Sequence, residues 1–249
     1  MEVWIYGVRP VEELFRRRPE RVRELLLARQ DRALGRLEVA ARERGIPVRL
    51  VRPEEVERAA RTLDHQGVAA QAPLPEYLDF EGLLARLGQL DAARVLVLDC
   101  IQDPQNLGAL LRAADGAGVS GVVIPRDRAA GLSPAVLSAS AGAAEWVPVS
   151  RVVNLQRAME AFKEAGFWLV AADPEAEKDY RAEAYPPRVG LVIGAEGAGL
   201  RPLVRKACDL AVRIPLLGRV ASLNAATAAA VVLFEMAAQA GEAKKVPSR

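Results

Sequence analysis

The sequence predicts an α/β protein whose larger part is a doubly wound parallel sheet, and three observations carry this prediction. Short apolar runs alternate with helical patterns along most of the chain, as strands and helices do in such sheets. Runs such as Val189–Ile193 and Leu210–Ile214 are apolar at consecutive positions, as strands buried on both faces are. Each of these two runs ends in a loop of special residues, glycines in one and proline with glycine in the other. Ligands collect at the carboxyl ends of parallel strands, so the two loops suggest one small-molecule pocket on neighbouring strand ends.

The composition indicates a folded chain with a charge bias in its first third. With 249 residues, of which 51% are hydrophobic and 27% charged, the chain can form one large domain or two modest ones with a real core. Residues 1–72 carry 15 basic residues, all arginine, and 12 acidic ones, whereas acidic residues slightly outnumber basic ones in the remainder. Arginine suits phosphate binding, so the bias is weak evidence for an RNA partner, although solvated helix faces account for most such charges.

Several classes of site are poor candidates. Cys100 and Cys208 form neither a Cys-x-x-Cys pair nor a disulfide framework, and we interpret both as small core residues in a reducing compartment. His65 is the only histidine, so neither a metal cluster nor a histidine-based triad is expected. The sequence has no signal pattern, and no apolar segment reaches the roughly 20 residues of a membrane span. We therefore expect a cytoplasmic protein without a metal.

The first 72 residues are predicted to form a small alternating α/β domain. Four short apolar runs predict strands: Val3–Tyr6, Val22–Ala28, Val48–Val51 and Val68–Ala72. Three helical patterns lie between them: Pro10–Arg17, a segment capped by Asp31 that runs to Arg44, and Pro53–Thr62. Prolines then break the pattern, and Phe80–Leu90 predicts a connecting helix. Residues 73–90 are thus a linker between a 1–72 domain and a 91–249 domain, and the His65-Gln66-Gly67 turn is expected to be structural.

The 91–249 domain continues the alternation of strands and helices. Beside the two runs that end in special loops, apolar runs predict strands at Arg94–Asp99, Gly121–Pro125, Trp146–Val149 and Phe167–Ala172. Helical patterns cover Leu107–Ala117, Ser133–Ala139, Asn154–Ala165 and an alanine-rich segment after Asn224. A charged loop is expected at Asp173–Pro187, and a frayed tail from Gly241 to Arg249.

The loop after Arg94–Asp99 leads into a helix with one unusual residue. Asp103 or Asn106 can cap this helix, whose first turn is at the pocket side of the sheet. Arg112 is the only base in an otherwise small and apolar helix. Asp115 lies one turn further on, so an exposed ion pair is the alternative to a functional role for Arg112.

The loop Gly194-Ala195-Glu196-Gly197-Ala198-Gly199 matches neither of the common glycine-rich phosphate motifs. A P-loop ends in Gly-Lys-Ser/Thr, whereas Gly199 is followed by leucine and arginine. A dinucleotide-binding loop needs glycine where Glu196 stands and follows an early strand. The glycines instead let the backbone approach a ligand closely. For Glu196, the alternative to a functional role is capping a helix that starts at Gly199–Leu200.

Three motifs together resemble, in order and spacing, motifs one to three of the SpoU/TrmH family of RNA 2′-O-ribose methyltransferases. They are NLGALLRAAD from Asn106 to Asp115, IGAEGAG from Ile193 to Gly199, and Ile214-Pro215-Leu216 followed by Ser222-Leu223-Asn224. The resemblance covers nearly the whole chain, and the set of motifs is highly specific. The Tyr6-Gly7 start, the His65-Gln66-Gly67 turn and the Asp103-Pro104-Gln105-Asn106 loop look most like the branch that methylates a guanosine of 23S ribosomal RNA.

This resemblance implies a SPOUT fold, in which the C-terminal segment of a parallel sheet is threaded into a deep trefoil knot. It also implies an N-terminal RNA-binding domain like ribosomal protein L30, and S-adenosylmethionine bound in the knot loops largely by main-chain groups. The matching positions for this cofactor are Gly194, Glu196, Gly199, Ile214, Leu216 and Leu223. The family forms homodimers, and the small residues of Ala225–Ala230 and Ala237–Ala240 would allow two copies to approach closely.

The resemblance assigns Arg112 the role of base toward the ribose 2′-OH. Because a guanidinium keeps its proton in ordinary surroundings, we prefer that Arg112 anchors the target phosphate and polarises the hydroxyl. Asn106, Glu196, Ser222 and Asn224 would hold the loops and the substrate.

A transfer RNA guanosine 2′-O-methyltransferase of the same family is the main competing function. Such enzymes often carry basic terminal helices, whereas this chain has only a short tail with Lys244-Lys245. Two functions from different classes also stay open: a nucleotide-binding oxidoreductase that uses the glycine loop, and a non-catalytic RNA-binding protein. The non-catalytic RNA-binding protein is disfavoured because the chain has the expected residues in all three methyltransferase motifs.

Overall fold

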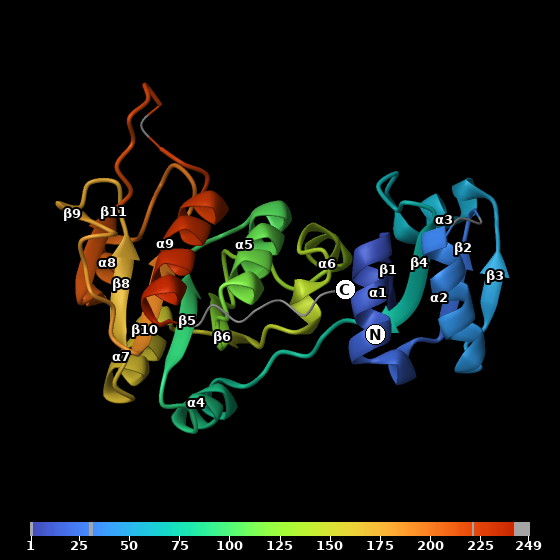
Figure 1. Cartoon of the computed structure of the whole chain (residues 1–249), viewed down its shortest axis with the longest axis horizontal. Helices are drawn as coiled ribbons and strands as arrows, with labels where there is room; N and C mark the ends of the chain where they lie inside the picture. Colours follow the sequence, from blue (N-terminus) through green and yellow to red (C-terminus); the bar gives the residue numbers. More distant parts are fainter. Residues whose placement is uncertain (1, 30–31, 221, 242–249) are drawn as a thin grey trace. The chain divides into compact units, whose positions relative to one another are not determined.

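The computed structural model describes residues 2–29, 32–220 and 222–241, and these residues divide into two compact units. The first unit contains the N-terminal segment up to Glu76 together with two pieces of later sequence, Leu107–Arg112 and Gly131–Trp146. The second unit contains the rest of the described chain. Each unit has its own sheet (Figure 1).

The sheet of the first unit has four strands in the order β1-β4-β2-β3. They are β1 (Glu2–Tyr6), β2 (Glu24–Leu27), β3 (Val48–Leu50) and β4 (Val68–Pro73). Strand β4 runs antiparallel to β1 and β2, whereas β2 and β3 are parallel. A parallel pair needs a crossover, and helix α2 (Arg32–Glu43) supplies it. All four predicted strands are confirmed, with their ends shifted by one or two residues.

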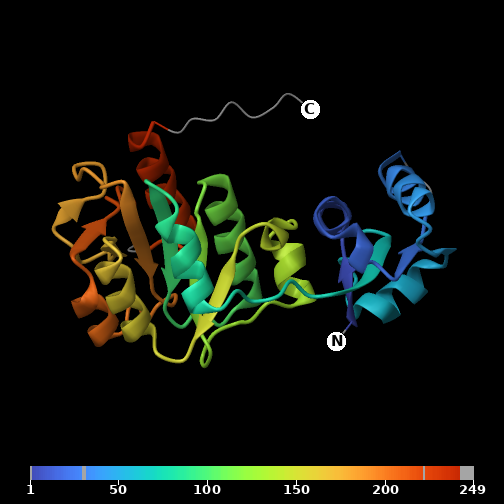
Figure 2. The ribbon, with the colours of Figure 1, turned by 90° about the horizontal axis from the view of Figure 1, so that it is seen from below.

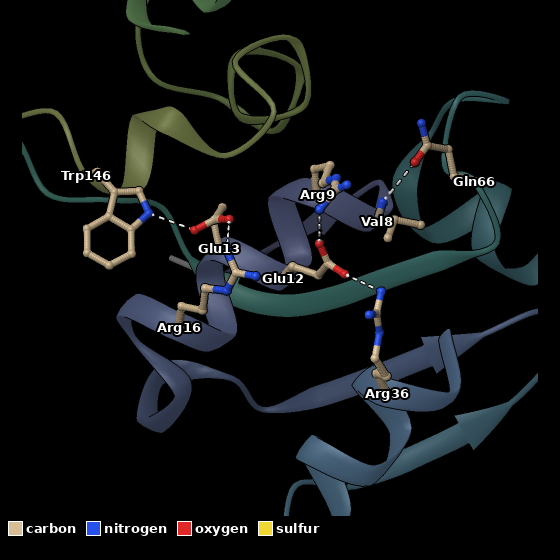
Figure 3. Close-up of polar contacts among 8 residues, drawn as sticks. All are labelled: Val8, Arg9, Glu12, Glu13, Arg16, Arg36, Gln66 and Trp146. Atoms are coloured by element: carbon tan, nitrogen blue, oxygen red, sulfur yellow. Dashed lines mark hydrogen bonds and ion pairs between the residues drawn. The ribbon is translucent and has the colours of Figure 1, made fainter. Parts of the chain in front are cut away.

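The other helices of this region are α1 (Val8–Arg17) and α3 (Pro53–Ala60), with the short 3₁₀ turn η1 (Pro19–Arg21). Helix α1 begins two residues before the predicted start at Pro10, because proline in a first turn removes no helical hydrogen bond. The predicted cap by Asp31 lies outside the described residues. The turn before β4 is structural, as predicted: the Gly67 N–H donates to Nδ1 of His65 at 2.9 Å, and the Val8 N–H donates to Oε1 of Gln66 at 3.0 Å (Figure 3).

Within the first unit, the segment Gly131–Trp146 packs against α1. This segment holds helix α6 (Pro134–Ala139) and the 3₁₀ turn η2 (Ala143–Glu145). Arg18 donates to both carboxylate oxygens of buried Glu145, at 2.7 and 2.9 Å, and Nε1 of Trp146 donates to Glu13 at 3.0 Å (Figure 3). The predicted strand at Trp146–Val149 is therefore wrong at its start, because Trp146 closes the η2 turn and the strand begins only at Val149.

The sheet of the second unit has seven strands in the order β7-β6-β5-β10-β8-β11-β9, and every adjacent pair is parallel. The strands are β5 (Ala93–Leu98), β6 (Gly121–Pro125), β7 (Val149–Val152), β8 (Trp168–Ala172), β9 (Lys178–Asp179), β10 (Arg188–Ile193) and β11 (Leu210–Arg213). The predicted class, α/β with a parallel sheet, is confirmed. The two glycine- and proline-containing loops were expected on neighbouring strands, and this was wrong: β8 lies between β10 and β11.

Helices cover both faces of the parallel sheet (Figure 2). They are α4 (Phe80–Gly88), α5 (Pro104–Gly116), α7 (Leu155–Glu164), α8 (Pro202–Ala207) and α9 (Ala225–Gln239). One face is an apolar core to which α4, α7 and α8 contribute, with the rings of Phe80 and Phe162 in edge contact 5.3 Å apart. Side chains alternate along a strand, so the other face carries the remaining buried residues, and α9 packs there against β8 and β10. The expected loop at Asp173–Pro187 contains the short edge strand β9.

Candidate active site

Three side chains from distant parts of the sequence form one hydrogen-bonded triad in the second unit. Nδ2 of Asn224 donates to Oδ1 of Asn106 at 2.7 Å and to Oε2 of Glu196 at 3.3 Å. Nδ2 of Asn106 donates to the same Glu196 oxygen at 3.2 Å. One residue of each sequence motif thus takes part. The alternative that Glu196 caps a helix at Gly199–Leu200 is wrong, because the next helix begins only at Pro202.

Helix ends hold two members of this triad in place. Asp103 caps α5 by accepting from the N–H groups of Gln105 and Asn106, both at 3.2 Å, and Pro104 occupies the first helical position. The predicted helix start at Leu107 was therefore late by three residues. Asn224 caps α9, because its Oδ1 accepts from the Ala226 and Thr227 N–H groups at 2.9 and 3.3 Å. The two caps fix the backbone at these helix starts, from which both asparagine amides reach Glu196.

The glycine loop that carries Glu196 is closed on itself. The Ala195 N–H donates to the Gly199 carbonyl at 3.1 Å, and the Gly199 N–H donates back at 2.8 Å. Gly194 faces this bridge so closely that a Cβ atom there would lie 2.2 Å from the Gly199 carbonyl carbon. Gly197 and Gly199 have φ angles of 77° and 65°, which favour glycine. Glycines at these positions therefore set the shape of the loop that presents Glu196.

A polar cleft lies at the carboxyl ends of β5, β6 and β10. Its walls are residues 100–103 after β5, Arg128 after β6, and most of the segment 195–202 after β10, with Asn106 among them. Asp99, which is fully buried at the end of β5, anchors the third wall: it accepts from the Arg201 N–H at 2.9 Å and from Nε of Arg201 at 2.7 Å. This hydrogen bond with Asp99 raises the pKa of Arg201.

An apolar cleft lies at the carboxyl ends of β8 and β11. Its lining residues are Ala172, Asp173, Pro174, Val212, Ile214, Leu216, Ser222, Leu223 and Ala228. Four of these are residues that the sequence motifs single out: Ile214, Leu216, Ser222 and Leu223. Asp173 is the charged member of the lining, and its carboxylate is paired with Arg205. A cleft of this kind suits a flat apolar ligand that also carries polar groups.

Sequence reasoning missed Asp99, Arg201, Asp173 and Arg128. A signal existed only for Asp99, since a carboxylate that ends an apolar strand needs a partner when it is buried. The partner of Asp99 is 102 residues away in the sequence, and spacing alone does not reveal it.

Arg112 lies two turns along α5 and does not join the triad. Its side chain is exposed and has no hydrogen bond or ion pair with the part of the chain that the structure describes, so the alternative pairing with Asp115 is not formed.

Both cysteines are partly buried free thiols. Burial raises the pKa of Cys208 to about 12. Within the described ranges, no helix has the length and apolar character of a membrane span, and no cluster of candidate metal ligands occurs.

Comparison with known families and proteins gives consistent matches. Residues 93–234 match the model of the SpoU rRNA Methylase family, and residues 4–78 match the RNA 2′-O ribose methyltransferase substrate binding model. The 23S rRNA (guanosine-2′-O-)-methyltransferase RlmB of Shewanella oneidensis is 39% identical over 94% of this chain and 96% of its own length. The Escherichia coli K12 protein of the same name is 37% identical over 96% of this chain and 99% of its own length.

Solved structures agree with these matches. The SpoU methyltransferase AviRb from Streptomyces viridochromogenes, crystallised with AdoMet, has a TM-score of 0.78 and 26% identity, and the match covers 98% of this chain and 92% of AviRb. A TrmH/SpoU tRNA modifying enzyme from A. aeolicus has a TM-score of 0.55 and 25% identity, and that match covers 66% of this chain and 83% of the enzyme.

Proposed function

The chain belongs to the SpoU rRNA methylase family, and from this premise we propose that it transfers a methyl group from S-adenosylmethionine to the ribose 2′-OH of a guanosine in 23S ribosomal RNA. The triad of Asn106, Glu196 and Asn224 is the observation that carries the proposal, because it joins all three sequence motifs beside a cleft. Ribosomal RNA is favoured over transfer RNA because the rRNA-methylating relatives match the N-terminal region as well, whereas the tRNA-modifying structure covers only 66% of the chain.

The residues of the apolar cleft fit S-adenosylmethionine. When bound, this cofactor supplies an electrophilic methyl group on a positively charged sulfur. Ile214, Leu216 and Leu223 offer apolar contacts for the adenine and ribose, and Ser222 offers a hydroxyl. Gly194, Glu196 and Gly199, on the loop after β10, complete the proposed set; Glu196 and Gly199 line the polar cleft. A titration with S-adenosylmethionine against NADPH separates this proposal from an oxidoreductase, since only the former should bind.

The proposed chemistry needs alignment of the hydroxyl with the methyl group and removal of one proton. Arg112 is the proposed anchor of the target phosphate and polarises the 2′-OH. The hydroxyl oxygen would bond to the methyl carbon as the carbon–sulfur bond breaks, and its proton would pass to solvent water late in the reaction. Its exposed and unpaired guanidinium is available for that contact. Asn106, Glu196, Ser222 and Asn224 are the proposed holders of the loops and of the ribose. The hydrogen bonds within the triad reduce the reorganisation that catalysis would otherwise require.

Several features of the family complete the proposal. The C-terminal segment would be threaded into a trefoil knot; the insertion of β11 beside β8, away from β10, and the return of α9 onto β8 and β10 support this. Residues 1–72 would be an L30-like RNA-binding domain, 73–90 a linker and 91–249 the SPOUT domain of a cytoplasmic enzyme. A homodimer through α9 is supported by exposed apolar side chains on this helix and on the segment before it. Phe234 of α9 is 51% exposed, and Leu217 and Val220, which precede the helix, are 101% and 74% exposed.

The test uses purified protein, labelled S-adenosylmethionine and two substrates, 23S ribosomal RNA and total transfer RNA. We expect label in one guanosine of the 23S RNA, located as a 2′-O-methyl nucleotide by mass spectrometry. Label in transfer RNA alone would favour the tRNA-methylating member of the family, and label in neither would refute the proposal.

The variant Arg112→Ala tests the proposed role of Arg112. It should bind S-adenosylmethionine normally and lose methyl transfer. Normal turnover by this variant would remove Arg112 from the mechanism.

A further inference from the structure

We infer that Arg128, on the loop after β6, binds a backbone phosphate that flanks the target ribose and so positions the RNA strand in the polar cleft. This inference rests on the proposed function, because the phosphate belongs to the RNA substrate. It adds a residue outside the three sequence motifs, which lines the polar cleft together with the glycine loop.

The position of Arg128 is fixed by the loop that carries it. The Ala130 N–H donates to the Ile101 carbonyl at 2.7 Å, and the Arg126 N–H donates to the Val152 carbonyl at 2.8 Å. These bonds tie the loop to the β5 exit on one side and to β7 on the other. Arg128 thereby lines the same cleft as Asn106 and Glu196.

The charges of the polar cleft are balanced except at Arg128. Arg201 is paired with the buried carboxylate of Asp99 through three contacts of 2.6 to 2.9 Å. The carboxylates of Asp103 and Glu196 accept hydrogen bonds from the α5 cap and from the two asparagines. Arg128 has no hydrogen bond or ion pair with any residue that the structure describes. An unpaired guanidinium facing a cleft is a ready partner for a phosphate, which it can bind through two parallel hydrogen bonds.

The backbone of Arg128 supports the same assignment. Its φ angle is +57°, in the left-handed region that residues other than glycine, asparagine and aspartate rarely adopt. Cys100, which lines the same cleft, also has a left-handed backbone with φ of +61°. Such conformations persist where the surroundings hold them, and they concentrate at functional sites. Burial and Asp99 raise the pKa of the Cys100 thiol, and the charges of Arg201 and Arg128 act against that rise.

The experiment compares four variants in single-turnover methyl transfer to 23S RNA. Arg128→Ala and Arg128→Asn remove the guanidinium, and asparagine tolerates the left-handed backbone well, so a loss shared by both is due to the side chain. Arg128→Lys keeps the charge without the two-pronged geometry. Arg126→Ala is the matched control: Arg126 is exposed on the same loop but does not line the cleft.

We expect Arg128→Ala and Arg128→Asn to slow transfer by about 10- to 100-fold, Arg128→Lys by less, and Arg126→Ala by under about twofold. The slope of log KM for RNA against log salt should fall by about 0.7 to 0.9 in the first two variants only. Affinity for S-adenosylmethionine and the melting temperature should stay at wild-type values in all four.

Wild-type transfer by Arg128→Asn, or an equal loss in Arg126→Ala, would overturn the inference while leaving the methyl transfer of the wild-type protein intact. Absence of transfer by the wild-type protein would instead refute the proposed function. The two failures are therefore distinguishable.

Discussion

The two clefts of the second unit lie at the same carboxyl edge of one sheet, yet they differ in chemistry. The polar cleft follows β5, β6 and β10 and contains two carboxylates and two guanidiniums. The apolar cleft follows β8 and β11, and among its lining residues only Asp173 is charged. The lining residues change from charged to mainly apolar between β10 and β8. A sheet edge divided in this way can hold a cofactor against apolar side chains on one side and a charged polymer on the other, with the triad at the boundary.

The largest effect is expected from the glycine loop, which lines the polar cleft and carries Glu196 of the triad. Gly194→Ala places a Cβ atom 2.2 Å from the backbone of Gly199, so the loop must move and the polar cleft loses its shape. We expect undetectable methyl transfer, weakened cofactor binding and a loss of about 1 to 3 kcal/mol in the free energy of unfolding. Activity assays, calorimetry and chemical denaturation measure the three.

Gly197→Ala is the control for Gly194→Ala, because nothing lies within 4 Å of a Cβ atom at position 197. The left-handed backbone there costs alanine about 1 kcal/mol, so this variant should be mildly destabilised and active. Equal losses in the two variants would show that backbone strain, and not the close approach at Gly194, decides the outcome.

Glu196 tests whether the triad works through geometry or through charge. Glu196→Ala removes the acceptor shared by Asn106 and Asn224, and we expect the single-turnover rate to fall about 100-fold while the Kd for cofactor rises much less. Glu196→Gln keeps an amide oxygen that can accept both bonds, so it should retain most of the activity. If Kd rises as much as the rate falls, Glu196 belongs functionally with the apolar cleft.

Leu223 tests whether the apolar cleft binds the cofactor. Leu223→Ala removes apolar contact from the apolar cleft, where the side chain is 37% exposed, and we expect the Kd for S-adenosylmethionine to rise about tenfold. The rate at saturating cofactor should stay near the wild-type value. Leu217→Ala is the control, because Leu217 is 101% exposed and does not line the cleft. A fall in the saturated rate without a change in Kd would contradict the division between the clefts.

The sequence predicted the local structure better than the tertiary arrangement. Fully apolar runs and helix starts such as those at Asn154 and Asn224 are local signals, and the corresponding strands and helices are present. The order of strands depends on long-range packing, so the insertion of β8 between β10 and β11 was not predicted.

The candidate site shows the same limit. The motifs singled out Asn106, Glu196 and Asn224 through a family resemblance, but their contacts span 28 to 118 residues of sequence. Asp99 ends an apolar strand, but no local pattern identifies Arg201 as its partner, and Arg128 carries no local pattern that distinguishes it from ordinary charged residues. Trp146 was placed in a strand because its neighbours are apolar, whereas a 3₁₀ turn and the contact with Glu13 decide its position.

The smallest expected effect concerns the two thiols, one of which lines the polar cleft. Burial raises the pKa of Cys208 to about 12, and burial together with Asp99 raises that of Cys100, so both are protonated at pH 8. Because the thiolate is the reactive form, maleimide should label both more slowly than a free thiol. Labelling of Cys208 should keep rising about tenfold per pH unit across the accessible range.

Only Cys100 borders the polar cleft, so saturating 23S RNA should slow its labelling several-fold and leave Cys208 unaffected. S-adenosylmethionine alone should protect neither thiol, because the apolar cleft contains no cysteine. Peptide mass spectrometry after short labelling times separates the two sites. Protection of Cys100 by the cofactor and not by RNA would reverse the assignment of the two clefts, since the cofactor would then occupy the side of the sheet edge that the charges assign to RNA.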